Sequence, residues 1–165
     1  MENEERRMQD EESRMQDQEK NSAFSTLHSA LIPERHGVIA VTLRDDKLLV
    51  IRRSQFVIAP GKLCFPGGGI EPNERPEQAL VREFREELGE TIIPVRPIWE
   101  SLTPWRVHLR WWVVRLPEPF TLTPNPREVE SVEWLSFAEL RKHPDLLSSN
   151  LPFLDLFAGR PELFR

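Results

Sequence analysis

The amino-acid sequence predicts an α/β protein in which a mixed β-sheet lies between helices. Three observations lead to that fold class. Short runs rich in β-branched and aromatic residues recur along the chain, with turn residues between them. One long helical pattern follows the second run, and two shorter helical patterns lie near the end. Strands on both sides of a central helix, with more helix at the end, are typical of a sheet whose faces are covered by helices.

The strands and outer helices can be placed from composition. HGVIAVTL and KLLVIRR, at residues 36–43 and 47–53, are rich in β-forming residues, and RDDK between them has the composition of a turn. The segment APGKLCFPGGG, residues 59–69, is broken by proline and glycine and is expected to be a loop. Further strands are expected at residues 91–102, 106–116 and 128–135, and further helices at residues 136–143 and 151–159.

The chain organisation follows from the polarity of its N-terminal part. Residues 1–20 are almost wholly polar, which predicts a polar, flexible tail over residues 1–30, and residues 31–165 form the predicted domain. The tail contains RMQD twice at a seven-residue spacing. A coiled coil would produce such a spacing, but one repeat is far short of the three to four heptads that support that interpretation.

Composition restricts the class of protein. A net charge of -5 argues against an extended nucleic-acid-binding surface, although it allows a small basic pocket for a phosphorylated ligand. No apolar run approaches the roughly 20 residues that span a bilayer, and the N-terminus lacks the apolar core of a signal peptide. The single cysteine, Cys64, excludes an intramolecular disulfide. We therefore expect a cytoplasmic enzyme or binding domain with no membrane partner, and the sequence leaves the oligomeric state unknown.

The central helix is expected over residues 76–88, with proline in its first turn and Gly89 as its C-terminal stop. Three of its acids, Glu83, Glu86 and Glu87, share one arc of about 100° beside the apolar stripe. Like charges at these spacings cost about 0.2–0.5 kcal/mol per pair even when exposed. Either this is a solvated face relieved by neighbouring arginines, or a hard cation such as Mg²⁺ lies between the carboxylates.

The spacing around that helix favours the cation. Gly68 is followed after five residues by Glu74, and after seven more by REFREELG, which begins at Arg82. This pattern resembles the Nudix box of the Nudix hydrolases, G-x5-E-x7-R-E-U-x-E-E-x-G-U with U apolar. The final apolar position of the pattern is Glu90 here. This departure affects the expected packing after the helix and not the expected role of the acids as metal ligands.

The resemblance implies a Nudix α/β/α sandwich and assigns roles to the matching residues. Glu83, Glu86 and Glu87 would hold Mg²⁺, with Mn²⁺ as an alternative, and the Gly68 carbonyl would be a further ligand. Glu83 is our choice of general base, although this role varies among Nudix enzymes. Arg82 would orient the carboxylates, and Glu74 would brace the loop.

Residues outside the box extend the expected site. Nudix enzymes of the MutT-like branch recruit another acid a few positions before a tryptophan; Glu128 fits best, and Glu130 and Glu133 are the alternatives. Arg52 and Arg53 alternate across a strand, so only one can face the cleft and bind phosphate, and Arg52 is slightly favoured. Asn150 lies where MutT-like enzymes place a residue that reads the base, while its position before a helix also fits an N-cap.

The implied activity is Mg²⁺-dependent hydrolysis of a nucleoside diphosphate linked to another moiety. The segment before the box and Asn150 favour a nucleoside triphosphate, including an oxidised purine such as 8-oxo-dGTP, cleaved to the monophosphate and pyrophosphate. The complete absence of tyrosine argues against the diadenosine polyphosphate hydrolases. An ADP-ribose or ADP-sugar pyrophosphatase is one alternative. A catalytically silent domain that only binds a nucleotide or a protein is another, but all box glutamates are present.

Overall fold

The computed structural model describes residues 35–164, so the tail expected at residues 1–30 lies outside the described residues. Its strands are β1 (Arg35–Val41), β2 (Leu43–Arg44), β3 (Lys47–Arg53), β4 (Leu63–Cys64), β5 (Gly67–Gly69), β6 (Ile93–Leu102), β7 (Val107–Arg115) and β8 (Val129–Leu135). Its helices are α2 (Pro76–Leu88), α3 (Phe137–Lys142) and α4 (Leu151–Phe157), with short 3-10 helices at Ser148–Asn150 and Pro161–Phe164.

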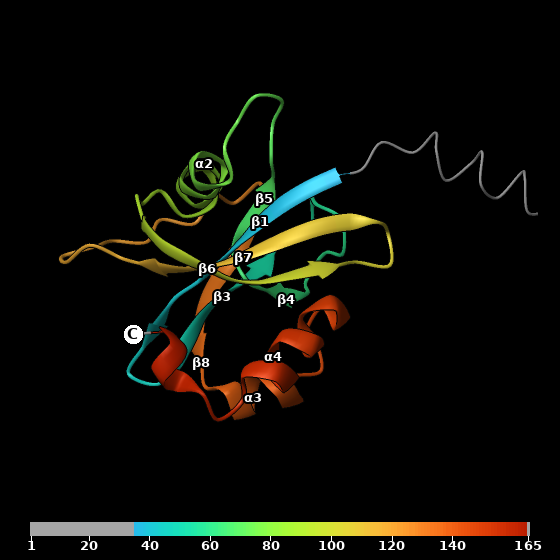
Figure 1. The fold of residues 1–165 in the computed structure, drawn as a ribbon, viewed down its shortest axis with the longest axis vertical. Coiled ribbons are helices and arrows are strands. Elements are labelled where there is room, and N and C mark those ends of the chain that lie inside the picture. Colours follow the sequence, from blue (N-terminus) through green and yellow to red (C-terminus); the bar gives the residue numbers. More distant parts are fainter. Residues whose placement is uncertain (1–34, 165) are drawn as a thin grey trace, which may run out of the picture. The chain divides into compact units, whose positions relative to one another are not determined.

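The strands form two sheets that lie between helical layers. The first is mixed, with the order β5-β1-β7-β6, in which β1 and β7 run parallel and the other pairs antiparallel. The second is antiparallel, with the order β2-β3-β4, and β8 pairs with β3. Figure 1 shows α2 on one side of the strands and α3 and α4 on the other. The α/β/α sandwich with a mixed sheet is confirmed, and the antiparallel sheet accompanies it.

The central strands are apolar on both faces because both faces are covered. In β3, Leu49 and Ile51 belong to the core beneath α2, whereas Leu48 and Val50 belong to the core beneath α3 and α4. Strands buried on both faces have near-continuous apolar sequences, since neither side of the pleat faces water. This two-sided burial fixes which side chains of each strand can reach the acidic helix.

Helix α2 begins and ends where the sequence predicts. Pro76 occupies its first turn, and Gly89 ends it in the left-handed conformation with a φ of 70°. The Gly89 N–H donates to the Arg85 carbonyl at 2.9 Å, which closes the last turn. The buried face of α2 includes Ala79, Leu80, Phe84, Glu87 and Leu88, so the predicted apolar stripe is packed on the sheet together with one acid.

The segment expected to be a loop at residues 59–69 contains β4 and β5, and that part of the prediction is wrong. Gly67–Gly69 pairs antiparallel with β1, although glycine has poor intrinsic strand propensity. The close approach of neighbouring atoms explains the choice of residue. A Cβ on Gly67, whose φ is +146°, would lie 2.1 Å from the Val38 carbonyl oxygen, and only glycine avoids that overlap.

Candidate active site

Glu87 is the buried carboxylate of the site. Its side chain lies under α2, and its Oε2 accepts a hydrogen bond from the Gly67 backbone N–H at 2.9 Å. Burial raises its pKa to about 8, and the neighbouring carboxylates of Glu83 and Glu128 act in the same direction. A carboxyl in this setting resists ionisation until a positive charge compensates it.

Glu83 lies directly against the glycine strand. A Cβ on Gly68 would be 2.2 Å from the Glu83 carboxyl carbon, so the bare glycine makes room for the carboxylate. Burial raises the pKa of Glu83, although the Arg82 guanidinium opposes that rise. Gly68 pairs with Val38 in the sheet, which fixes the surface on which the carboxylate rests. The role of the Gly68 carbonyl as a ligand stays a prediction.

Arg82 uses all five of its N–H donors within the site. Its Nε and Nη2 donate to the two oxygens of Glu74, each at 2.8 Å, and Nη2 also donates to the Gly69 carbonyl at 2.8 Å. Its Nη1 donates to Glu83 at 2.9 Å and to Glu86 at 3.2 Å. The guanidinium therefore ties the loop, the glycine strand and two acids together.

Glu74 holds the loop that precedes α2. Besides the paired bonds from Arg82, its Oε2 accepts from the Glu71 N–H at 3.0 Å. The Arg82 guanidinium lowers the pKa of Glu74 to about 2, so this carboxylate stays ionised under ordinary conditions. This geometry agrees with the bracing role that the box resemblance implies.

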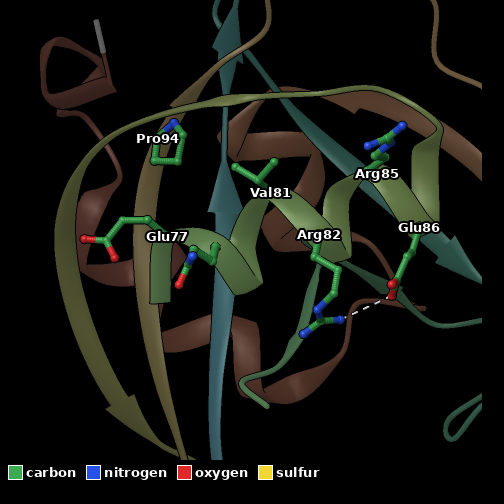
Figure 2. Close-up of a pocket in the computed structure, with 7 residues that line it drawn as sticks. Glu77, Val81, Arg82, Arg85, Glu86 and Pro94 are labelled. Carbon is green, nitrogen blue, oxygen red and sulfur yellow. Dashed lines mark hydrogen bonds and ion pairs between the residues drawn. The ribbon is translucent and has the colours of Figure 1, made fainter. Parts of the chain in front are cut away.

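Glu86 is the site acid most open to solvent, with a side chain that is 51% exposed. Figure 2 shows it beside Arg82 at the rim of a hollow of about 840 Å³, whose lining also includes Val81, Arg85 and Pro94. Glu83 and Glu87 lie deeper against the glycine strand. The three helix acids thus form a gradient from buried to exposed.

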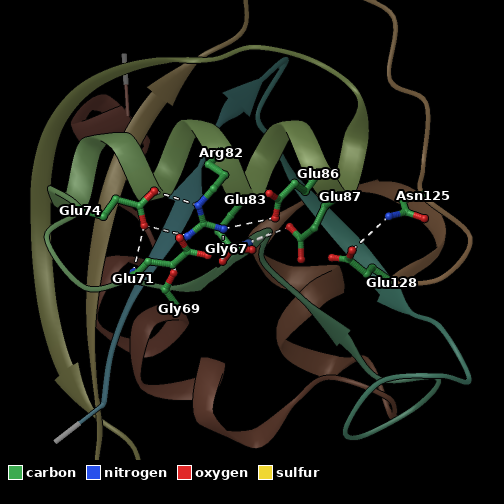
Figure 3. Close-up of polar contacts among 10 residues, drawn as sticks. All are labelled: Gly67, Gly69, Glu71, Glu74, Arg82, Glu83, Glu86, Glu87, Asn125 and Glu128. Carbon is green, nitrogen blue, oxygen red and sulfur yellow. Dashed lines mark hydrogen bonds and ion pairs between the residues drawn. The ribbon is translucent and has the colours of Figure 1, made fainter.

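Glu128 is the acid from outside the box that the structure brings to α2. Figure 3 shows its carboxylate turned toward Glu87, and its charge raises the pKa of both Glu83 and Glu87. Glu133 instead pairs with Arg52 at 3.1 Å, and Glu130 is exposed on β8. Of the three acids considered from the sequence, only Glu128 lies beside the box glutamates.

These carboxylates lie near one another, but they do not have the arrangement of a coordination site. Within residues 35–164, no three His, Cys, Asp or Glu side chains are arranged to hold a metal ion as they stand. Arg82 draws Glu83 and Glu86 toward itself, and Glu87 is held by the Gly67 N–H. The donor set nevertheless fits a hard divalent cation, because its oxygens repel one another, Glu87 is buried and Glu83 is partly buried.

The metal-free protein should lose stability as the pH rises. Glu87 has a pKa of about 8 in the folded protein against about 4.3 in an unfolded chain, so folding favours its protonated form. The resulting contribution to the free energy of unfolding is fully present below about pH 4.3. It decreases by up to ~1.4 kcal/mol per pH unit above that and is lost once the pH has risen through about 8. The lowered pKa of Glu74 changes the free energy of unfolding only at more acidic pH. Thermal unfolding in EDTA between pH 6 and 8.5 should show a falling Tm, and Glu87→Gln should flatten the curve.

Arg52 and Arg53 lie on different sides of the sheet. Arg52 is held on the side of α3 by Asp145 at 3.0 Å and Glu133 at 3.1 Å, and it also donates to the Gly61 carbonyl. Arg53 lies on the side of α2, where its charge lowers the pKa of Glu87. Its Nε donates to the Ile58 carbonyl at 2.6 Å. The geometry therefore favours Arg53, whereas the sequence slightly favours Arg52.

Asn150 is buried at the start of α4, where its contacts do not match the N-cap interpretation, and its role in reading a base stays a prediction. Its side chain makes no capping hydrogen bond to α4. Its Oδ1 instead accepts from the Phe65 N–H at 3.4 Å, in the segment that leads to the glycine strand. A cavity of about 420 Å³ adjoins this position, lined by Trp99, Ser101, Leu102, Thr103, Pro104, Ser148, Ser149 and Pro152.

Two residues that sequence reasoning did not assign to the site also contribute contacts. Asn125 donates to Glu128 at 3.1 Å, and the only sequence signal there is a turn before Pro126. Glu90, the departure from the box, accepts from the N–H groups of Thr91 at 2.9 Å and Thr121 at 3.1 Å. The last box position therefore makes a polar contact with a neighbouring segment in place of an apolar one.

The fold and the site together define a class of protein: an α/β/α sandwich in which an acidic helix lies against a glycine strand. Comparison with known proteins gives the family, because the NUDIX domain model matches residues 33–157. The chain belongs to the Nudix hydrolase family, whose members generally use divalent cations. No helix within residues 35–164 is long and apolar enough to cross a membrane.

Individual relatives agree with that assignment. The chain is 35% identical over 131 residues to the CTP pyrophosphohydrolase of Escherichia coli strain K12, an alignment that covers 75% of this chain and 94% of the relative. The solution structure of the E. coli ORF135 protein has a TM-score of 0.63 at 31% identity and covers 77% of this chain and 93% of that one. The crystal structure of a MutT protein from Methanosarcina mazei Go1 has a TM-score of 0.67 at 20% identity, with coverage of 80% and 98%, and supports the fold alone.

Proposed function

We propose that this protein hydrolyses nucleoside triphosphates to the nucleoside monophosphate and pyrophosphate, with Mg²⁺ as the preferred cation and Mn²⁺ as a substitute. The observation that carries the proposal is the group of four carboxylates, Glu83, Glu86, Glu87 and Glu128, around the glycine strand. A bound cation would neutralise diphosphate charge and lower the pKa of an attacking water. Small nucleotides are the proposed partners, and the cytoplasmic location stays a prediction.

Each step of the proposed hydrolysis is assigned to particular residues of the site. Glu83 would take the proton from the attacking water, because its carboxylate lies in the site at Gly68 and is only partly exposed. The water oxygen would form a bond to phosphorus while the anhydride P–O bond breaks and pyrophosphate leaves. Arg82 would hold Glu83 and Glu86 in place through Nη1, and Glu74 would keep Arg82 fixed. These roles follow the matching positions of the box.

Substrate contacts are proposed on both sides of the acids. Arg53 lies near Glu87 and would bind a phosphate, whereas Arg52 is engaged by Glu133 and Asp145. The nucleobase would occupy the cavity beside Trp99. Asn150 would fix the position of that cavity relative to the acids, because its side chain accepts from the Phe65 N–H, and Phe65 lies three residues before Gly68.

The base of the preferred substrate is either an oxidised purine or cytosine. The sequence suggests an oxidised purine, while the relative that this chain matches over 94% of its length is named a CTP pyrophosphohydrolase. We favour a cytidine triphosphate, because the chain aligns with that relative over nearly all of the relative's domain. ADP-ribose and ADP-sugars are the alternative substrate class.

A nucleotide panel tests the proposal. The protein would be incubated with Mg²⁺ and CTP, dCTP, GTP, 8-oxo-dGTP or ADP-ribose, and pyrophosphate and phosphate would be measured separately. We expect pyrophosphate from the triphosphates, fastest with a cytosine base, and no product after EDTA. Release of phosphate alone would contradict cleavage to the monophosphate and pyrophosphate. Turnover confined to ADP-ribose would favour the alternative substrate class over the nucleoside triphosphates. No turnover of any nucleotide would refute the proposal.

A further inference from the structure

Residues 121–128, here called the strap, connect the region after β7 to β8 and lie along the C-terminal end of α2. The Thr123 N–H donates to the Leu88 carbonyl at 2.7 Å, and the Asn125 N–H donates to the Glu87 carbonyl at 2.8 Å. The last carbonyls of a helix have no partner within it, so these bonds satisfy two of them. Glu90 adds a third link through the Thr121 N–H.

Asn125 is the residue that connects this backbone contact to an acid of the site. Its Nδ2 donates to Glu128 Oε1 at 3.1 Å, while its Oδ1 accepts from the Arg127 N–H at 3.1 Å. Its carbonyl accepts from the N–H groups of Glu128 and Val129, at 2.9 and 2.7 Å. One side of the amide therefore shapes the turn, and the other side binds the carboxylate (Figure 3).

The backbone of Glu128 is fixed separately from its side chain. The Ser54 N–H donates to the Glu128 carbonyl at 2.9 Å, and the Ser54 hydroxyl donates to the Arg127 carbonyl at 2.7 Å. The Glu128 carboxylate lies near two other carboxylates, and like charges would drive it toward solvent. The Asn125 amide opposes that rotation with a neutral donor, which adds no charge to compete with a cation.

We propose that Asn125 is a positioning residue that holds the Glu128 carboxylate beside Glu87 in the cation site. The inference rests on the proposed function for the identity of the site, but it concerns cation binding and not turnover. Removing the Nδ2 donor should allow Glu128 to leave the site. Residues that orient metal ligands in this way typically change metal affinity by 10–100-fold, so we expect a loss on the order of tenfold.

The test is a double-mutant cycle read out by Mn²⁺ affinity in the absence of nucleotide. Asn125→Ser keeps an oxygen that can accept from the Arg127 N–H, and it replaces the Nδ2 donor to Glu128 with a hydroxyl that lies one bond closer to the backbone and does not reach as far. Mn²⁺ binding would be measured by electron paramagnetic resonance for the wild type, Asn125→Ser, Glu128→Gln and the double variant. Thr123→Ser is the control, because it changes the same strap and leaves its backbone bond in place.

Asn125→Ser should weaken Mn²⁺ binding about tenfold in the wild-type background and should have no further effect beside Glu128→Gln. An equal loss in both backgrounds would mean that Asn125 acts through the fold, and unchanged affinity would mean that it does not hold the ligand. Either outcome overturns the proposal, as does a wild type that binds no Mn²⁺. A protein that binds Mn²⁺ but cleaves no nucleotide refutes only the proposed function.

Discussion

Replacing Glu83 with glutamine is expected to reduce kcat for nucleoside triphosphate hydrolysis by about 10³-fold, within the usual range for loss of a general base. Glutamine is similar in shape and can still accept from Arg82, so the fold should persist. It cannot take a proton from water, and it is a poorer ligand for a hard cation. Steady-state kinetics at saturating Mg²⁺, with circular dichroism to check the fold, would measure the effect.

The control for this substitution is Glu130→Gln, which removes the same charge from an exposed position on β8. It should leave kcat within twofold of the wild type. If Glu83→Gln retained full turnover, Glu83 could not be the base, and Glu87 would become the next acid to test. A large loss in both variants would indicate an effect of net charge instead of a specific role.

The second large effect is expected in the glycine strand, where three consecutive residues should respond differently to alanine. Gly67→Ala would place a Cβ 2.1 Å from the Val38 carbonyl oxygen, at a φ of +146°. Neither backbone can move far, so the free energy of unfolding should fall by about 3 kcal/mol or more. Gly69→Ala meets nothing within 4 Å and should change the free energy of unfolding by less than about 1 kcal/mol.

Gly68→Ala should reduce activity more than it reduces the free energy of unfolding. Its Cβ would lie 2.2 Å from the Glu83 carboxyl carbon, which belongs to a side chain that can rotate away. We therefore expect a smaller loss of stability than for Gly67→Ala but a loss of turnover close to that of Glu83→Gln. Urea unfolding and kinetics on the three variants would test the order. Equal destabilisation at all three positions would contradict the close approaches described above.

The limits of α2 were predictable because local rules decide them. Pro76 suits the first turn of a helix, and Gly89 adopts the left-handed conformation that ends one. The box pattern also indicated roles for Glu74 and Arg82, although the paired hydrogen bonds between them are seen only in the structure. Where a single element or a strong motif sets the geometry, the sequence is sufficient.

Other features depend on contacts between segments that are distant in sequence. The strand at Gly67–Gly69 exists because β1 lies beside it, and glycine-rich sequence alone indicates a loop. Strand alternation predicted that Arg52 and Arg53 point to opposite sides, but it could not say which side faces α2. A β-bulge in the pairing with β8 falls between these two residues, and its position cannot be read from either strand alone.

The strap also has a consequence for local unfolding. The amide groups of Thr123 and Asn125 lie outside any helix or strand, yet their acceptors are the final carbonyls of α2. Fraying of the helix end and release of the strap therefore break the same hydrogen bonds, so the two should open as one cooperative unit. Such opening would move Glu128 away from Glu87, and the lifetime of the proposed cation site would then depend on the local stability of one helix terminus.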